Sequence, residues 1–212
     1  MSELDYKINI KQNHDMVLNS VSITREKPSL LLHSCCGPCS TAVIERLAED
    51  YNITVYFYNP NITDAKEYIK RRDSQLLVID EYNKEHKHEN KVSFLEGTYD
   101  TRAFYKIIEG LENEPEGGGR CKKCYLLRLE QTAIMASMNN YDSFATTLTI
   151  SPHKSFEIIG EIGNKVSMEY GVNFLNENFK KKAGFQRSIE LSKKYNLYRQ
   201  NFCGCEFSVW EK

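Results

Sequence analysis

The chain has 212 residues, of which 41% are hydrophobic, and its charged residues nearly cancel to a formal net charge of -1. This length and hydrophobic content predict one domain with a sizeable core plus an appendage, and they leave little room for a second domain. The near-zero net charge gives no overall signal for a nucleic-acid-binding protein. Residues 1–29 are polar without the apolar core of a signal peptide, and no apolar run is long enough to span a bilayer, so we expect a cytoplasmic protein.

The charge is unevenly distributed along the chain. Residues 80–116 contain ten acidic and five basic residues, whereas residues 179–199 contain seven basic residues and one acidic residue. A local basic patch is the footprint expected of contacts to phosphate groups. A solvated, Lys-rich helix face explains the same pattern equally well.

The chain contains seven cysteines. An odd number of cysteines in a cytosolic protein of this size indicates metal or redox chemistry rather than a structural disulfide framework.

The first predicted element is a short buried strand at residues 30–32, followed directly by cysteines. The pair Gly37-Pro38 breaks this apolar run, and helical spacing of apolar residues begins after Cys39. Cys35 and Cys36 are therefore expected in the turn between a strand and a helix. A helix N-terminus favours negative charge, so we expect these thiols to have lowered pKa values.

Two further strands are predicted, each followed by a helix. Residues 53–58 form a β-branched and aromatic run that ends in a turn at residues 59–61, and Thr63 or Asp64 can cap the long helix that follows. Residues 92–97 form the third strand, which places Asp100 between that strand and the next helix.

The second half of the chain contains a loop, a helix and a fourth strand. Residues 114–120 have the composition of a flexible loop, and Cys121 and Cys124 are expected to open a helix with both sulfurs on one face. The fourth strand is predicted at residues 143–150, and residues 151–154 end it. From about residue 155 we expect helices, interrupted at four glycines: Gly160, Gly163, Gly171 and Gly184.

Strands that alternate with helices predict an α/β fold with a parallel sheet. Ligands bind outside the carboxyl ends of the strands in such sheets. We expect a polar N-terminal extension at residues 1–29, a catalytic core at residues 30–160, and a helical extension at residues 161–212 that closes the site as part of one folding unit. The polar and sulfur-bearing residues that follow the four strands are Cys35, Cys36, Asn59–Asn61, Asp100 and Ser151–Lys154.

Three chemistries fit the cysteine pattern. The pair Cys36 and Cys39 at a helix start is typical of thioredoxin-like disulfide exchange, although Cys35 and a second Cys-x-x-Cys are superfluous to it. Two Cys-x-x-Cys pairs also suit a structural zinc site, as in a zinc-stabilised RNA-binding module without catalysis. That alternative leaves Cys35, Cys203 and Cys205 unused. An iron-sulfur site accommodates more thiolates, but sequence spacing alone does not separate iron from zinc.

Five motifs in register resemble the QueH-type epoxyqueuosine reductases. They are residues 33–40 (HSCCGPCS), 58–62 (YNPNI), 120–125 (RCKKCY) with 128–129, 146–148 with 151–154 (SPHK), and 198–205 (YRQNFCGC). The family pattern usually has Tyr at the positions of His153 and Phe202, which leaves the cysteine set intact.

The resemblance implies a Rossmann-like, adenine-nucleotide hydrolase-like fold with helices on both faces of the sheet. It implies cobalamin-independent reduction of epoxyqueuosine to queuosine at the wobble position of tRNA, with an unidentified electron donor. It also implies a [4Fe-4S] cluster and an additional mononuclear iron held by cysteine and aspartate. A low-potential cluster and an iron with an open position suit a two-electron deoxygenation.

Site residues are assigned on this basis. The metal ligands are predicted to be Cys35, Cys36, Cys121 and Cys124, with Asp100 as carboxylate ligand or, alternatively, as a helix cap. Cys39 is a ligand or a neighbouring thiol, and Cys203 and Cys205 are ligands, a redox pair or structural thiols. His153 and Lys154 are candidates for proton donation or phosphate contact. Substrate or tRNA contacts are assigned to Tyr58, Asn59, Arg120, Arg128, Lys154 and Arg199.

Overall fold

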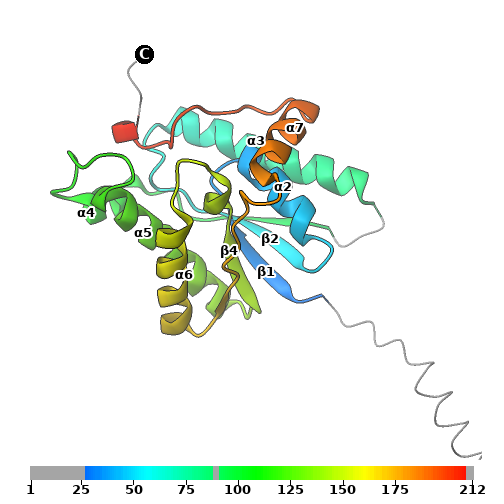
Figure 1. Cartoon of the computed structure of the whole chain (residues 1–212), viewed down its shortest axis with the longest axis horizontal. Helices are drawn as coiled ribbons and strands as arrows, with labels where there is room; N and C mark the ends of the chain where they lie inside the picture. The colour runs from blue at the N-terminus through cyan, green and yellow to red at the C-terminus, as the bar shows by residue number, and fades with distance from the viewer. Residues whose placement is uncertain (1–26, 88–90, 209–212) are drawn as a thin grey trace, which may run out of the picture.

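The computed structural model describes residues 27–87 and 91–208, so most of the predicted extension at residues 1–29 lies outside it. Within these ranges, five strands form one parallel sheet in the order β3-β2-β1-β4-β5 (Figure 1). The chain moves outward from β1 to β3 and then returns to pair β4 with β1, which creates a topological switch point between these two strands. The strands are β1 (Ser29–His33), β2 (Asn52–Phe57), β3 (Ser93–Glu96), β4 (Ser143–Thr146) and β5 (Asn173–Phe174).

Helices cover both faces of the sheet. Leu30 and Leu32 of β1 pack in one apolar cluster with α2, α3 and α7, whereas Leu31 packs in a second cluster with α5 and α6. Alternate residues of a strand point to opposite faces, so the two clusters are the two sides of one sheet. The predicted α/β fold is confirmed. The helices are α2 (Gly37–Leu47), α3 (Ala65–Glu85), α4 (Thr101–Ile108), α5 (Gly119–Met138), α6 (Phe156–Tyr170) and α7 (Gly184–Lys194).

Short polar residues fix where these helices begin. The Asp64 carboxylate accepts the backbone N-H of Lys66 at 2.8 Å and thereby caps α3, as predicted. Pro38 lies in the first turn of α2, where its missing N-H leaves no helical hydrogen bond unmade. No helix among the described residues is long and apolar enough to cross a membrane.

Two details of the sheet differ from the sequence-based expectation. The fourth strand ends at Thr146, and residues 147–150 form a 3-10 helix because the Thr146 hydroxyl accepts the backbone N-H of Leu148 and turns the chain. The sequence also gave no sign of β5, because two residues are too few to show a strand pattern.

The glycines of the last third divide into two kinds. Gly171 ends α6 in the left-handed region with φ of 65°, as expected of a helix stop. Gly160 and Gly163 lie inside α6, so the predicted breaks there are wrong. A Cβ atom on Gly163 would overlap the ring of Phe174, which shows that this glycine lets α6 lie close against β5.

The C-terminal extension is helical only in part. After α7, residues 195–205 form no regular element and run along the carboxyl end of the sheet to a short 3-10 helix at Glu206–Ser208 (Figure 1). The predicted boundary between residues 160 and 161 falls inside α6, and the domain division stays a prediction.

Candidate metal centre

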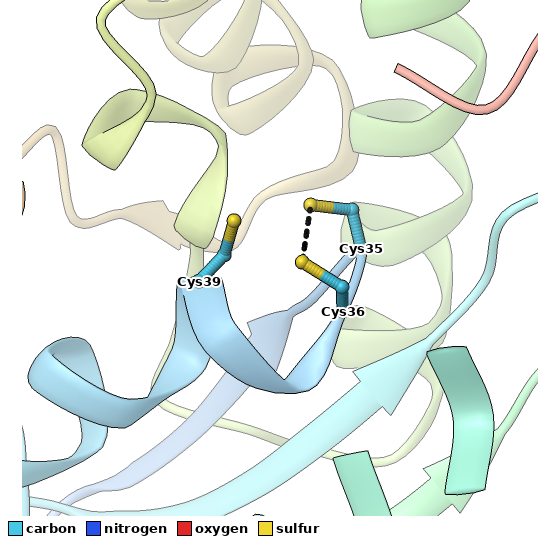
Figure 2. Close-up of side chains that lie close together, drawn as sticks. All are labelled: Cys35, Cys36 and Cys39. Atoms are coloured by element: carbon cyan, nitrogen blue, oxygen red, sulfur yellow. Dashed lines mark hydrogen bonds between the residues drawn. The ribbon is translucent and has the colours of Figure 1, made fainter. Parts of the chain in front are cut away.

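Three cysteines gather where β1 meets α2. The sulfurs of Cys35, Cys36 and Cys39 all lie within 4.8 Å of one another, with 3.8 Å between Sγ of Cys35 and Sγ of Cys36. Figure 2 shows the three side chains turned toward a common space at the start of α2. Of the residues that the structure describes, these form the one group of three close metal-ligating side chains. Thiolate donors in such a group suit zinc or iron.

Neighbouring strands and α3 hold the backbone of this turn in place. Asn59 Nδ2 donates to the Ser34 carbonyl at 2.8 Å, and the Ser34 hydroxyl donates to Gln75 Oε1 at 2.7 Å. Both bonds are buried, so they fix the residue that precedes the cysteines. Asn59 is therefore committed to supporting the turn, which favours a structural role over the predicted substrate contact.

His33 joins three strands just before the cysteines. Its Nε2 lies 3.2 Å from the Tyr58 carbonyl and its Nδ1 lies 2.9 Å from the Thr146 hydroxyl. Because a carbonyl only accepts, the ring hydrogen belongs on Nε2 and the hydroxyl of Thr146 donates to Nδ1. Complete burial lowers the pKa of His33 to about 3, so the imidazole is neutral at pH 7.

The three thiols differ in acidity. Hydrogen bonds from Cys36 and Cys39, with the nearby charges of Lys154 and Arg128, lower the pKa of Cys35. Burial raises the pKa of Cys36 to about 12, and hydrogen bonding to the other two sulfurs raises that of Cys39. The metal-free group therefore favours one thiolate, at Cys35, supported by two thiols. The lowered pKa expected for Cys36 is not found, because burial raises it.

A second set of cysteines lies on α5 and near the C-terminus. Cys121 accepts the backbone N-H of Gly117 at 3.2 Å, and Cys124 packs in an apolar cluster with Cys205 and Phe104. Burial raises the pKa values of Cys121, Cys124 and Cys205, that of Cys124 to about 12. These cysteines do not belong to the group of three, so their assignment as ligands stays a prediction.

Cys203 links the two sets of cysteines. It lines a cavity of about 310 Å³ together with Cys35 and Cys39. It also lies near Cys121 and Cys124, where burial and then the proximity of Cys203 raise the pKa values. A site that used both sets of thiols would therefore include Cys203 or lie beside it.

Two cations face the sulfurs. Arg128 is 1% exposed, its Nη2 has no partner, and its one side-chain hydrogen bond is a long contact of 3.4 Å from Nε to the Cys124 carbonyl. Burial lowers the pKa of Arg128, but the charges of Cys124, Cys203 and Cys35 outweigh burial and raise it. Burial also lowers the pKa of Lys154, and the charges of Cys203 and Cys35 outweigh burial, so the pKa of Lys154 is raised. The site is therefore built to stabilise negative charge, such as that of metal-bound thiolates.

The cavity also contains several of the predicted polar residues. His153, Lys154, Arg128 and Arg199 line it beside the cysteines, whereas Tyr58, Asn59, Arg120 and Asp100 do not. The cavity therefore brings together residues from four of the five QueH-like motifs: those at 33–40, at 120–129, at 146–154 and at 198–205. Its other lining residues are Pro38, Arg71, Glu116, Ile150, Ser151, Pro152, Phe185, Ser188, Gln200, Asn201 and Phe202.

Arg120 and Tyr58 are occupied within the fold. The Arg120 guanidinium is buried, donates to the carbonyls of Glu112 and Glu114, and lies over the ring of Phe207. The Tyr58 ring is buried and stacked on Tyr56, with 5.9 Å between ring centroids. These contacts favour structural roles for both residues over the predicted contacts to tRNA.

Asp100 caps a helix. Its Oδ1 accepts the backbone N-H of Arg102 at 3.0 Å, and the carboxylate forms an exposed ion pair with the Arg102 guanidinium. Hydrogen bonding to Arg102 lowers the pKa of Asp100. The capping alternative is thus observed, and the role of Asp100 as a metal ligand stays a prediction.

Sequence reasoning missed the side chains that hold the strap, which we define as residues 198–205. Arg71 and Glu67 of α3 form a buried ion pair beneath the strap, and Gln200 Nε2 lies 2.7 Å from Cys36 Sγ. The spacing of four residues between Glu67 and Arg71 was a sequence signal for an ion pair on a helix. Exposed ion pairs show the same spacing, so the sequence did not reveal that this pair is buried.

Comparison with known proteins identifies the family. The sequence model of "Epoxyqueuosine reductase QueH" matches residues 30–211. The chain belongs to the QueH family. It is 41% identical over 205 residues to the epoxyqueuosine reductase QueH of Streptococcus pyogenes serotype M1, covering 95% of this chain and 80% of that protein. Identity to the epoxyqueuosine reductase QueH of Staphylococcus epidermidis is 40% over 210 residues, covering 96% and 87%.

A solved structure, a predicted subunit of tRNA methyltransferase from Methanocaldococcus jannaschii, aligns with a TM-score of 0.49 and 13% identity, covering 79% of this chain and 74% of that one. The predicted QueH family and the oxidoreductase class that it implies are confirmed by the sequence relatives. Members of this family catalyse the last step of queuosine biosynthesis.

Proposed function

We propose that this QueH chain reduces epoxyqueuosine to queuosine at the wobble position of tRNA without cobalamin. The epoxide loses its oxygen, two electrons and two protons are consumed, and the products are an alkene and water. The observation that carries the proposal is the group of three cysteines at the topological switch point, two of which, Cys35 and Cys39, line a cavity. Membership of the QueH family supports the assignment of epoxyqueuosine as the substrate.

The donor chemistry of the site fits an iron-sulfur centre. Close sulfurs supply soft ligands. Arg128 and Lys154, which form no ion pair with a carboxylate among the described residues, offset the negative charge of a thiolate-bound cluster. We assign Cys35, Cys36, Cys121 and Cys124 to the ligand set of a [4Fe-4S] cluster and an additional iron, with Asp100 as the carboxylate candidate. When bound, such a centre relays electrons one at a time and polarises the C-O bond.

The protein's own residues bind the substrate and supply protons. The cavity accepts the modified base, which must leave the anticodon stack to reach the sulfurs. Lys154 and His153 line the same cavity and are positioned to donate the protons that leave with the oxygen as water. The raised pKa of Lys154 keeps its ammonium charged at neutral pH, so it can hydrogen-bond to the departing oxygen and stabilise the negative charge that develops there.

The tRNA partner needs a basic surface. Ion pairs occupy some of the basic residues at 179–199, which favours the others as phosphate contacts. Arg187 is paired with Glu45 and Glu190, and Lys194 is paired with Glu85. Lys181 and Lys182, in contrast, are exposed. We assign phosphate contacts to Lys181 and Lys182, in the turn before α7, rather than to the whole basic segment at residues 179–199. The electrons come from an external low-potential donor, and we place the protein in the cytoplasm.

Metal analysis of anaerobically purified protein tests this function. Iron with acid-labile sulfide, together with conversion of epoxyqueuosine to queuosine in tRNA under reducing conditions, is the expected result. Zinc alone would support the structural zinc alternative, which three close thiols also suit. Disulfide exchange is disfavoured because Cys36, the first thiol of its Cys-x-x-Cys, is completely buried.

A further inference from the structure

The strap forms one wall of the cavity and carries groups of the candidate site. Five of its residues, 199–203, line the cavity. Cys203 is one of them, and the side-chain amide of Gln200 donates to Cys36 Sγ. The strap has no helix or strand of its own over 198–205, so contacts from elsewhere fix its position; one is the backbone hydrogen bond from Thr63 N-H to the Gly204 carbonyl at 3.2 Å, and others involve side chains.

One arginine makes three contacts to the strap. Arg71 of α3 is 1% exposed; its Nη1 donates to the Cys203 carbonyl at 3.0 Å and its Nη2 to the Phe202 carbonyl at 3.1 Å. The guanidinium carbon also lies 5.0 Å from the centroid of the Phe202 ring. The planar fork of a guanidinium suits two neighbouring carbonyls, which a lysine ammonium does not match.

Glu67 orients this arginine and holds the other end of the strap. Its Oε1 accepts from Arg71 Nε at 2.6 Å, and its Oε2 accepts from the Tyr198 hydroxyl at 2.8 Å. Gly204 has φ of 110°, and a Cβ atom there would lie 3.0 Å from Arg71 Nη1, so the glycine leaves room for the arginine. The buried Glu67–Arg71 ion pair therefore forms hydrogen bonds with the strap at residues 198 and 202–203.

We propose that Glu67 and Arg71 are positioning residues for the reaction: they hold the strap so that Cys203 faces the cavity and Gln200 reaches Cys36. This inference rests on the proposed function for its catalytic consequence. The hold on the strap is a property of the fold and is tested separately. Arg71 also lines the cavity, but its guanidinium is committed to Glu67 and to the strap carbonyls, so neither residue is assigned to substrate.

The test compares three variants of the full-length, anaerobically purified enzyme. Glu67→Gln/Arg71→Met removes both charges together, so that no unpaired charge stays buried. Arg71→Lys keeps the charge but loses the fork. Arg72→Gln is the control, because Arg72 is the next residue of α3 and pairs with Asp73 at the surface.

Hydrogen exchange of strap amides, measured with β1 amides as an internal reference, gives the first readout. We expect exchange in the strap to accelerate about tenfold or more in the double variant and in Arg71→Lys, since one charge-assisted hydrogen bond is worth about that factor. Exchange in β1 and throughout Arg72→Gln should match wild type. Unchanged strap exchange, equal acceleration in β1, or wild-type exchange in Arg71→Lys would each overturn the proposal.

Kinetics on epoxyqueuosine-containing tRNA give the second readout. We expect kcat to fall at least about tenfold in both Arg71 variants while KM changes little, because phosphate contacts elsewhere dominate tRNA affinity. A loosened strap with full kcat would refute the catalytic part. If wild-type protein shows no reductase activity, the proposed function fails, while the exchange result still decides whether the ion pair holds the strap.

Discussion

Replacing Gly37 by alanine is expected to damage both the fold and the metal centre. Gly37 is the first residue of α2 and stands between Cys36 and Pro38. A Cβ atom there would overlap the backbone carbonyl oxygen of Ser74 and lie 2.7 Å from its carbonyl carbon. Ser74 lies within α3, so its carbonyl cannot move without shifting the helix.

The size of the effect follows from two opposing contributions. Overpacking costs about 1–3 kcal/mol, and contact with backbone places this site toward the upper end. Replacing a helical glycine by alanine returns about 0.5–1 kcal/mol. The net loss is about 1–2 kcal/mol, which lowers the melting temperature of a chain of this size by roughly 2–8 °C.

Gly119→Ala is the matched control. Gly119 is the first residue of α5 and precedes the other Cys-x-x-Cys, but the nearest atom to its added Cβ would be 3.6 Å away. Urea unfolding and iron per chain should show losses in Gly37→Ala only. If Gly37→Ala unfolds at the wild-type urea concentration and keeps its iron, or if Gly119→Ala loses as much, the close approach of α2 and α3 is not what fixes the cysteine turn.

Three further experiments test the site and the tRNA surface. Cys124→Ser should lower iron and sulfide content, because a hydroxyl is a poor ligand for a soft cluster; full iron content would remove Cys124 from the ligand set. Asp100→Asn should leave stability within about 0.5 kcal/mol, because Asn also caps helices, and should lose one iron per chain and turnover if Asp100 is a ligand; unchanged iron and turnover would restrict it to the cap. Charge reversal at Lys181 and Lys182 should weaken tRNA binding and its salt dependence, whereas the same change at Arg187, which is already paired, should have less effect; equal losses would place the tRNA surface on α7 as well.

Much of the fold was predictable because its signals are local. The apolar run of β1, the turn residues after β2 and the cap at Asp64 each stand out within a few residues of sequence. The 3-10 helix at Thr147–Ile150 was not predictable, because its β-branched residues continue a strand pattern and the hydroxyl of Thr146 decides the turn. Local pattern therefore gave the architecture and missed the point where one hydrogen bond redirects the chain.

The candidate site was predictable to a lesser degree. Motifs located the cysteines, and sheet topology placed Cys35, Cys36 and Cys39 at a ligand-binding edge. Burial was the missing quantity. It makes Arg120 a support of the fold rather than a surface cation, raises the pKa of Cys36, and turns an ordinary i,i+4 pair on α3 into the anchor of the strap. Each depends on residues more than 100 positions away or on the packing of whole helices.

The bond between His33 and Thr146 also bears on how the protein folds. These residues are separated by 113 positions, and β1 and β4 pair over the same interval. Contacts between such distant segments form late, because a long loop must close first. On the ribosome, the cysteine turn therefore lacks one of its two neighbouring strands until most of the chain has been made. A nascent or truncated chain that ends before residue 143 would carry five of the seven cysteines without the strand that supports their turn.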